Sequence, residues 1–298
     1  YIIGALTINP ATLYVTAAAK TKVYGEGDPA LTYAHAGAVG EEEPAFDGAL
    51  SRSAGETVGP YAIGKNTLAL KDGENGFKAA NYAISYTGAN LVIARKPLTI
   101  TAKGQVYTYN TLKQGPDGAE FTPETGLGDY AAWTALASGD ALASLNVAGS
   151  ATEAGLYANA LVPGEAVIKK GADVVTGNYD VTYAPGNLTI GQAPGMAVGA
   201  EDGGGVYRGS GYGIVAAANR DGATVRYLNI ANGKYELETS PERTDVGELV
   251  VMFRATHPNY ETATGSATVT VTPGTLYVTA AAKTKVYGEG DPALTYAH

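Results

Sequence analysis

Apolar and polar residues alternate in short segments along the whole chain, at the two-residue period of a β-strand. Examples are LYVT from Leu13, LTIT from Leu98 and VTVT from Val269. Glycine-rich and proline-containing turns separate these segments, and the only helix we expect is a short one around Ala131 to Leu136. The pattern predicts an all-β chain of small β-sandwich modules arranged end to end.

One stretch of the chain occurs twice. The sequence TLYVTAAAKTKVYGEGDPALTYAH runs from Thr12 to His35 and returns letter for letter from Thr275 to His298. Neutral positions would have drifted if only the fold were shared, so this identity indicates recent duplication or homogenisation of a long unit. We therefore expect the chain to be one stretch of a longer tandem-repeat protein.

Three short motifs recur in the same order and set the phase of the modules. The first is a Val-Tyr pair, the second a glycine at the start of a strand, and the third an Asn-Tyr pair. They occur at Val23-Tyr24, Val106-Tyr107 and Val206-Tyr207, then at Val58-Gly59, Ala154-Gly155 and Val246-Gly247, and finally at Asn81-Tyr82, Asn178-Tyr179 and Asn259-Tyr260. An alternating strand, a glycine-containing turn and a β-branched strand follow each Asn-Tyr pair, which predicts a closing hairpin in every module.

These motifs divide the chain into five parts. Residues 1–11 are expected to be the closing strand of an upstream module. Residues 12–96 and 97–191 are two related modules, of which the second has a longer middle insertion. Residues 192–272 are a third module, and residues 273–298 start a copy of the first. Each complete module has the length of a small domain.

Composition argues against several classes of function. The 298 residues include 40 Gly, 14 Pro and 21 Tyr, and the formal net charge is -9. This acidic balance argues against binding nucleic acid. The chain has no apolar run long enough for a membrane helix, so we expect no membrane insertion in this stretch. Without cysteine there are no disulfides, thiolate metal sites or cysteine nucleophiles.

Residues 12–96 resemble the MBG family of bacterial surface repeats. The segments that carry this resemblance are TKVYGEGDPALTY (Thr21 to Tyr33), GALSRSAGETVGPYAI (Gly48 to Ile63) and NYAISYTGANLVI (Asn81 to Ile93). The second module is similar to a related repeat of large cell-wall adhesins through LTITAKGQVYTYN (Leu98 to Asn110) and GNYDVTYAPGNLTI (Gly177 to Ile190). The third resembles a bacterial immunoglobulin-like domain through PERTDVGELVVMFRA (Pro241 to Ala255) and HPNYETATGSATVTV (His257 to Val271).

The resemblance implies a non-catalytic stalk segment of a large adhesin-like protein on the bacterial cell surface or cell wall. Its partners would then be the neighbouring modules of the same chain. As an alternative, the modules themselves bind host or bacterial surface glycans or proteins by avidity. A second alternative is a filament in which an incomplete terminal hairpin pairs with another chain by strand addition. We expect no enzymatic activity, because the family brings no catalytic residues.

Few residues suggest chemistry of their own. His35, His257 and His298 are the only histidines, and we expect no catalytic centre at them. His257 is expected in a turn or at the surface, because no frame of metal ligands or of a catalytic triad accompanies it. Tyr130 and Trp133 are the tentative ligand contacts, since exposed rings stack on sugars, and the competing interpretation is that both rings cover the module's own core.

Two further kinds of site stay open from the sequence. The acidic turns at Glu26-Gly27-Asp28, Asp72 to Asn75 and Glu201-Asp202 are either calcium sites or, as we expect, solvated turns without a cofactor. An isopeptide link between a buried Lys and an Asn or Asp would add stability in a chain without cysteine. Such a link also needs a neighbouring acid, and sequence does not show that proximity.

Overall fold

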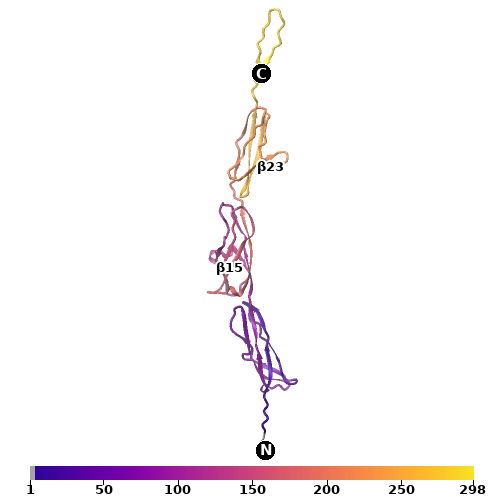
Figure 1. Ribbon diagram of the computed structural model, residues 1–298, viewed down its shortest axis with the longest axis vertical. Helices are drawn as coiled ribbons and strands as arrows, with labels where there is room; N and C mark the ends of the chain where they lie inside the picture. Colours follow the sequence, from indigo (N-terminus) through magenta and orange to yellow (C-terminus); the bar gives the residue numbers. More distant parts are fainter. Residues whose placement is uncertain (1–3) are drawn as a thin grey trace. The chain divides into compact units, whose positions relative to one another are not determined.

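The computed structural model describes residues 4–298, and strands account for most of its regular structure (Figure 1). The chain divides into two compact units. Unit 1 contains the residues up to Gln105 together with Gln114–Ala151 and Leu156–Leu188. Unit 2 contains Val106–Lys113, Thr152–Gly155 and Thr189–His298. The predicted all-β fold class is confirmed.

The first sandwich of unit 1 uses strands β1 to β9. One sheet has the order β3-β1-β8, and its strands are β1 (Ala11–Ala17), β3 (Tyr33–Ala36) and β8 (Tyr82–Thr87). The other has the order β2-β9-β6-β5, with β2 (Lys20–Val23), β9 (Ala89–Ala94), β6 (Gly59–Gly64) and β5 (Ser51–Arg52). A separate pair is formed by β4 (Glu43–Asp47) and β7 (Ala69–Glu74), and the 3-10 turn η1 (Ala79–Asn81) precedes β8.

Alternation of side chains builds the core of this sandwich. In β1, Leu13 and Val15 are fully buried, whereas Tyr14 between them is exposed. In β9, Leu91 and Ile93 are buried in the same way. In both strands alternate side chains are thus buried on one face, as the two-residue period of the sequence predicts, although the outward-facing Val92 of β9 is apolar.

The second sandwich of unit 1 repeats this plan. One sheet has the order β13-β10-β17, from β10 (Lys96–Ala102), β13 (Ala131–Trp133) and β17 (Tyr179–Ala184). In the other, β18 (Gly186–Gly191), β15 (Gly155–Lys170), β14 (Asp140–Ala148) and β12 (Ala119–Phe121) are neighbours in that order, and β16 (Asp173–Val174) pairs with β15. The helical segments are η2 (Pro123–Thr125), α1 (Leu127–Tyr130) and η3 (Thr176–Asn178). Buried Leu98, Ile100, Leu145 and Leu161 belong to this core.

Unit 2 is centred on one sheet with the order β20-β25-β24-β22-β23. Its strands are β20 (Gly203–Val206), β25 (Tyr260–Thr272), β24 (Gly247–His257), β22 (Thr224–Asn229) and β23 (Lys234–Leu237). Two short pairs are β19 (Val198–Gly199) with β21 (Ala217–Ala218) and β26 (Thr279–Ala280) with β27 (Tyr296–Ala297), and β11 (Gln105–Thr108) ends in this unit. Val251, Phe253 and Val269 lie in its core.

The prediction that the two strands after each Asn-Tyr pair form a hairpin is wrong, because in the first module these strands, β8 and β9, do not pair with each other. β8 pairs with β1 in one sheet, whereas β9 pairs with β2 and β6 in the other, so the two strands face each other across the sandwich. The chain crosses between the sheets at Gly88, where a Cβ would lie 3.0 Å from the Ile63 carbonyl oxygen. In the third module the two strands predicted for this hairpin form one continuous strand, β25. Alternation predicts that these segments are extended, but it does not determine the partner of each strand.

Two smaller expectations also change. The helix predicted around Ala131 to Leu136 is wrong: α1 ends at Tyr130, and Ala131–Trp133 is a strand, because these residues pair with the edge of β10. Of the closing strand expected over residues 1–11, residues 1–3 lie outside the described residues. Gly4 to Pro10 form no strand, and strand structure begins at Ala11. None of the helices among residues 4–298 is long and apolar enough to cross a bilayer.

Candidate functional site

The two tentative ligand contacts have different surroundings. Tyr130 stacks on Phe121 with ring centroids 3.9 Å apart, so its ring is engaged by the protein itself. Trp133 is 38% exposed and lines an open hollow of about 490 Å³ together with Pro123, Leu127 and Leu136. Trp133 is therefore the more exposed ring of the pair, whereas Tyr130 is half-buried.

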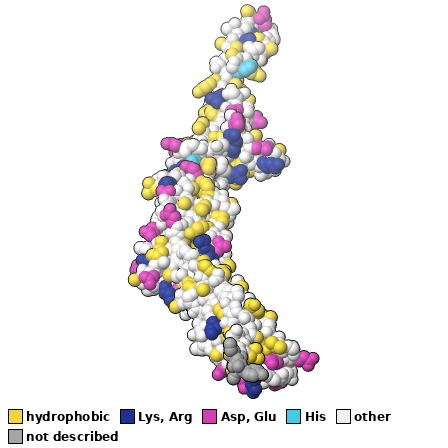
Figure 2. Space-filling model, turned by 60° about the horizontal axis from the view of Figure 1, so that its bottom comes forward, with side chains coloured by type: hydrophobic (Ala, Val, Ile, Leu, Met, Phe, Trp, Pro, Cys, Tyr) yellow, Lys and Arg dark blue, Asp and Glu magenta, His cyan; other side chains and the backbone are white. Residues whose placement is uncertain are grey.

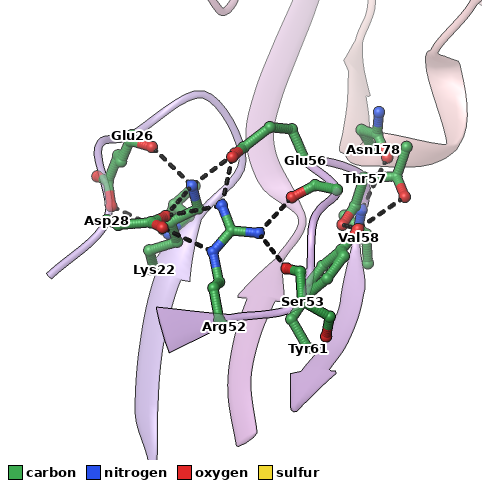
Figure 3. Close-up of polar contacts among 12 residues, drawn as sticks. Lys22, Glu26, Asp28, Arg52, Ser53, Glu56, Thr57, Val58, Tyr61 and Asn178 are labelled. Carbon is green, nitrogen blue, oxygen red and sulfur yellow. Dashed lines mark hydrogen bonds and ion pairs between the residues drawn. The ribbon is translucent and has the colours of Figure 1, made fainter. Parts of the chain in front are cut away.

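Four charged side chains form a cluster of ion pairs in unit 1 (Figure 3). The Lys22 Nζ lies 2.7 Å from the Asp28 Oδ1 and 2.6 Å from the Glu56 Oε2. The Arg52 guanidinium contacts both acids, with its Nε 2.6 Å from the Asp28 Oδ2. The two cationic side chains are almost buried and the acids lie partly in solvent. We call these four residues the ionic cluster.

Every charge in the ionic cluster is stabilised in its ionised form. Hydrogen bonds from Arg52 and then from Lys22 lower the pKa of Asp28 to about 2. The hydrogen bond from Lys22 is the largest cause of the lowered pKa of Glu56. Burial opposes the charge on Lys22, but its bonds to the two acids outweigh that effect and raise its pKa.

The ionic cluster has the residue types of an isopeptide site, namely a buried lysine, an aspartate and a second acid. Condensation of the Lys22 amine with the Asp28 carboxyl releases water and needs a neutral amine and a protonated carboxyl. The pKa shifts run in the opposite direction for both groups. The geometry therefore supports a set of ion pairs that ties β2 to the loop at Glu56.

Sequence reasoning missed the ionic cluster for a definite reason. Lys22 stands in an ordinary alternating strand, and only Asp28 is close to it in sequence. Glu56 lies 34 residues further along the chain. In the structure, the copy of the repeat places the counterparts of Lys22 and Asp28 in the same ion pair, Lys285 with Asp291.

The acidic turns hold protein donors. Asp28 binds Lys22 and Arg52, Asp72 accepts from the Lys78 Nζ at 2.8 Å, and Asp202 accepts from the Thr268 N–H at 2.7 Å. Within residues 4–298 no group of three or more His, Asp or Glu side chains is arranged to hold a metal ion. On the face that Figure 2 shows, Lys and Arg side chains are scattered among acidic ones.

The Asn-Tyr motif makes a specific contact inside unit 1. Asn178 is 7% exposed, and its Oδ1 accepts a hydrogen bond from the Val58 N–H at 3.0 Å (Figure 3). The ring of Tyr179 packs edge-on against the ring of Tyr24, with centroids 5.5 Å apart. Asn178 and Tyr179 belong to the second sandwich, whereas Val58 and Tyr24 belong to the first, so the motif joins the two sandwiches.

The hydroxyl of Tyr179 makes two hydrogen bonds in addition to the contact of its ring with Tyr24. Its hydroxyl donates to the Asp140 Oδ2 at 2.6 Å and accepts from the Ala137 N–H at 2.9 Å. Burial, followed by the bond to Asp140, raises the pKa of Tyr179. Ala137 in turn lies close to Gly25, next to Tyr24, where a Cβ would lie 2.6 Å from the Ala137 Cβ.

The same contact occurs within unit 2. Asn259 is 4% exposed, and its Oδ1 accepts from the Ala154 N–H at 2.8 Å while its Nδ2 donates to Glu153. The ring of Tyr260 packs edge-on against Tyr109, again with centroids 5.5 Å apart. We call this arrangement the Asn-Tyr joint: an asparagine that binds a backbone N–H, followed by a tyrosine whose ring meets a second tyrosine.

One part of this chain matches a known protein family. Residues 13–92 match the MBG domain of the YGX type, so strands β1 to β9 form an MBG domain, and the resemblance noted for residues 12–96 is confirmed. The match indicates an extracellular repeat module. No curated protein sequence matches the chain.

Solved structures with similarity to the chain include domains of several cell-adhesion molecules. They include Drosophila N-cadherin EC1-4 at 8% identity, over 90% of this chain and 76% of that one, with a TM-score of 0.26. Mouse clustered PcdhgC3 EC1-3 matches at 13% identity, over 72% of this chain and 76% of that one, with a TM-score of 0.22. The chain spans 42% of the N-terminal eight Ig domains of DSCAM isoform 1.30.30, which match at 11% identity over 91% of this chain with a TM-score of 0.22.

Proposed function

We propose that this segment is a non-catalytic stalk of a large bacterial surface protein of the adhesin type, which holds a distal binding region away from the cell. The observation that carries the proposal is the Asn-Tyr joint. It occurs once inside each unit, with the same asparagine acceptor and the same edge-on tyrosine pair. Modules that each bind a ligand independently do not need contacts with their neighbours. A stalk does need such contacts, because they limit bending at each linker.

The exact repeat of Thr12–His35 supports the same function, because a stalk lengthens by addition of further units. Small-angle X-ray scattering tests it. We expect a maximum dimension that is close to the summed lengths of the modules and unchanged between low and high salt. The variant Asn178→Ala/Asn259→Ala should give a broader distance distribution at unchanged secondary structure. A broad distribution for the unsubstituted chain would contradict a stalk.

A second candidate function rests on Trp133. Its ring is exposed beside the apolar hollow lined by Leu127 and Leu136, which is the kind of surface on which a sugar ring stacks. The modules would then bind surface glycans directly, and many weak contacts would add by avidity. Binding to a glycan array by the full chain, lost in Trp133→Ala and kept in Tyr14→Ala, supports this function. Tyr14 is the control because its ring is exposed on another sheet.

A further inference from the structure

One end of unit 2 carries counterparts of the two groups that bind an Asn-Tyr pair in the joints described above. In the two joints, the receiving tyrosine is the residue directly after a short strand, and its N–H binds the end of the last strand of its module. Tyr24 donates to the Ala94 carbonyl and Tyr109 to the Gly191 carbonyl, each at 2.9 Å. Tyr207 follows β20 and donates to the Thr272 carbonyl at 2.8 Å. Tyr207 therefore matches the two receiving tyrosines, Tyr24 and Tyr109, in position and in backbone hydrogen bonding.

The backbone position that binds the joint asparagine also has a counterpart at this end of the sheet, where Val206 pairs with Thr272 and Gly247 pairs with Val271. Val58 and Ala154, whose N–H groups bind the joint asparagines, each stand directly before the glycine that starts a strand. Val246 stands directly before Gly247 at the start of β24. Tyr207 is 49% exposed and Val246 is 47% exposed, whereas Tyr24 inside its joint is 4% exposed. We call Tyr207 and Val246 the open end.

The other half of a joint is present in unit 1. Asn81 ends a 3-10 turn and donates its N–H to Lys78, just as Asn178 ends one and donates to Val175. The Tyr82 hydroxyl accepts from the Val39 N–H at 2.9 Å and donates to the Glu42 Oε2 at 2.5 Å. The hydroxyl of Tyr179 has the same two kinds of partner, a backbone N–H from Ala137 and the carboxylate of Asp140. Asn81 itself is exposed.

The length of the linker fits a third joint. In each module the first paired residue lies opposite the tyrosine of the Asn-Tyr pair: Ala11 with Tyr82, Lys96 with Tyr179 and Ala193 with Tyr260. Lys96 comes two residues after the end of β9 at Ala94, and Ala193 two residues after the end of β18 at Gly191.

After β25 ends at Thr272, the same step leads to Gly274, directly before the repeat at Thr275. The repeat also folds in the same register, because Thr279 pairs with Ala297 as Thr16 pairs with Ala34. A module that continues this repeat would therefore present its Asn-Tyr pair next to Tyr207.

We propose that the open end is a docking surface for a module of the Thr12–Ala94 type, joined two residues after Thr272 and seated through the counterparts of Asn81 and Tyr82. The asparagine accepts from the Val246 N–H, and the tyrosine ring packs edge-on against Tyr207. This inference rests on the proposed function, because it assumes that the Asn-Tyr joint couples modules.

The test extends the 298-residue chain by further residues of the repeated module. A second copy of residues Ala36 to Ala94 is appended after His298, and backbone amide exchange is measured by NMR for both lengths of chain. We expect exchange at Val246 to slow by about tenfold or more on extension, since a hydrogen-bonded amide exchanges only when its bond opens. Asn81→Ala in the appended copy should remove that protection, and Asn90→Ala there, an exposed asparagine in a strand, should leave it.

Tyr207→Ala gives a second route to the same answer, because this exposed ring adds little to its own module. It should reduce the protection of Val246 in the extended chain and leave the folding of the appended copy unchanged. Unchanged exchange at Val246 on extension, with the copy folded, would overturn the proposal. A separate measurement tests the proposed function. If Asn178→Ala leaves the amide exchange rate of Val58 unchanged, the Asn-Tyr joint does not protect Val58 and the proposed function fails.

Discussion

The Oδ1 of Asn178 accepts a hydrogen bond from the Val58 N–H across 120 residues of sequence. Asn259 and Ala154 make the same contact across 105 residues, at 2.8 Å. In both cases the asparagine side chain is almost fully buried and the donor is a backbone group before a strand-opening glycine. The asparagine therefore supplies a buried hydrogen-bond acceptor to a backbone N–H of the preceding module, which a solvent-exposed turn residue would not do.

Asn178→Ala should destabilise unit 1 by about 1 to 3 kcal/mol, because it leaves the Val58 N–H without its partner in a largely dry contact. Chemical denaturation monitored by circular dichroism measures this loss. Asn90→Ala is the matched control, since Asn90 is an exposed asparagine in β9. Equal losses for the two variants would mean that the buried hydrogen bond adds nothing.

Gly25→Ala should destabilise the contact between Tyr24 and Tyr179. Gly25 has φ +85, and a Cβ there would lie 2.6 Å from the Ala137 Cβ, so backbone strain and a clash act together. We expect a loss of about 2 kcal/mol or more in unit 1. Gly27→Ala is the control, because a Cβ at Gly27 meets nothing within 4 Å. A neutral Gly25→Ala would show that the two sandwiches separate freely at this point.

The sequence predicted the strands and the fold class, because alternation decides which face of a strand is buried, as Leu13 and Val15 show in β1. It did not predict which strands pair. β8 and β9 are close in sequence and read as a hairpin, yet they lie in different sheets. Sheet partners depend on contacts with β1 and β6 that are distant in sequence, and no local pattern records them.

The Asn-Tyr motif was visible as a recurring spacing, but its role was not. Its partners Val58 and Tyr24 lie in the preceding module, so only the folded chain brings them to Asn178 and Tyr179. The spacing even misplaced one partner: the Val-Tyr pattern equates Tyr24 with Tyr107, whereas the joint uses Tyr109.

The ionic cluster should make stability depend on acid in a specific range. The pKa of Asp28 is lowered to about 2 by Arg52 and Lys22, from an ordinary value of 3.8. Ionised Asp28 therefore contributes its full stabilisation above about pH 4 and loses it as the pH falls toward 2. Because Asp28 is partly exposed, we expect only about 1 kcal/mol at neutral pH.

Thermal unfolding of the natural chain and of Asp28→Asn, followed from neutral pH downward, measures this contribution. The difference in melting temperature between the two should shrink as the pH falls below about 4, since protonation removes the same charge that the substitution removes. Asp72→Asn is the control, because Asp72 pairs with exposed Lys78 at the surface. A difference that stays constant down to pH 2 would exclude Asp28 as its source.

Intact mass spectrometry should show no loss of water at the ionic cluster. An amide between the Lys22 Nζ and the Asp28 Cγ requires a deprotonated amine and a protonated carboxyl, and the ion pairs raise the pKa of Lys22 and lower that of Asp28. Both groups are therefore held in the unreactive state, even though Nζ and Oδ1 lie 2.7 Å apart. We expect the folded chain to have the mass of its unmodified sequence.

Arg52→Met sharpens this test, because it removes the largest cause of the lowered Asp28 pKa and leaves Lys22 and Glu56 in place. If protonation of Asp28 is the barrier, any condensation should appear first in this variant and should be lost again in Arg52→Met/Lys22→Met. A mass lower by one water in the natural chain, mapped by digestion to a peptide that links Lys22 to Asp28, would show that the cluster is a covalent brace and that the charged groups seen here precede its formation.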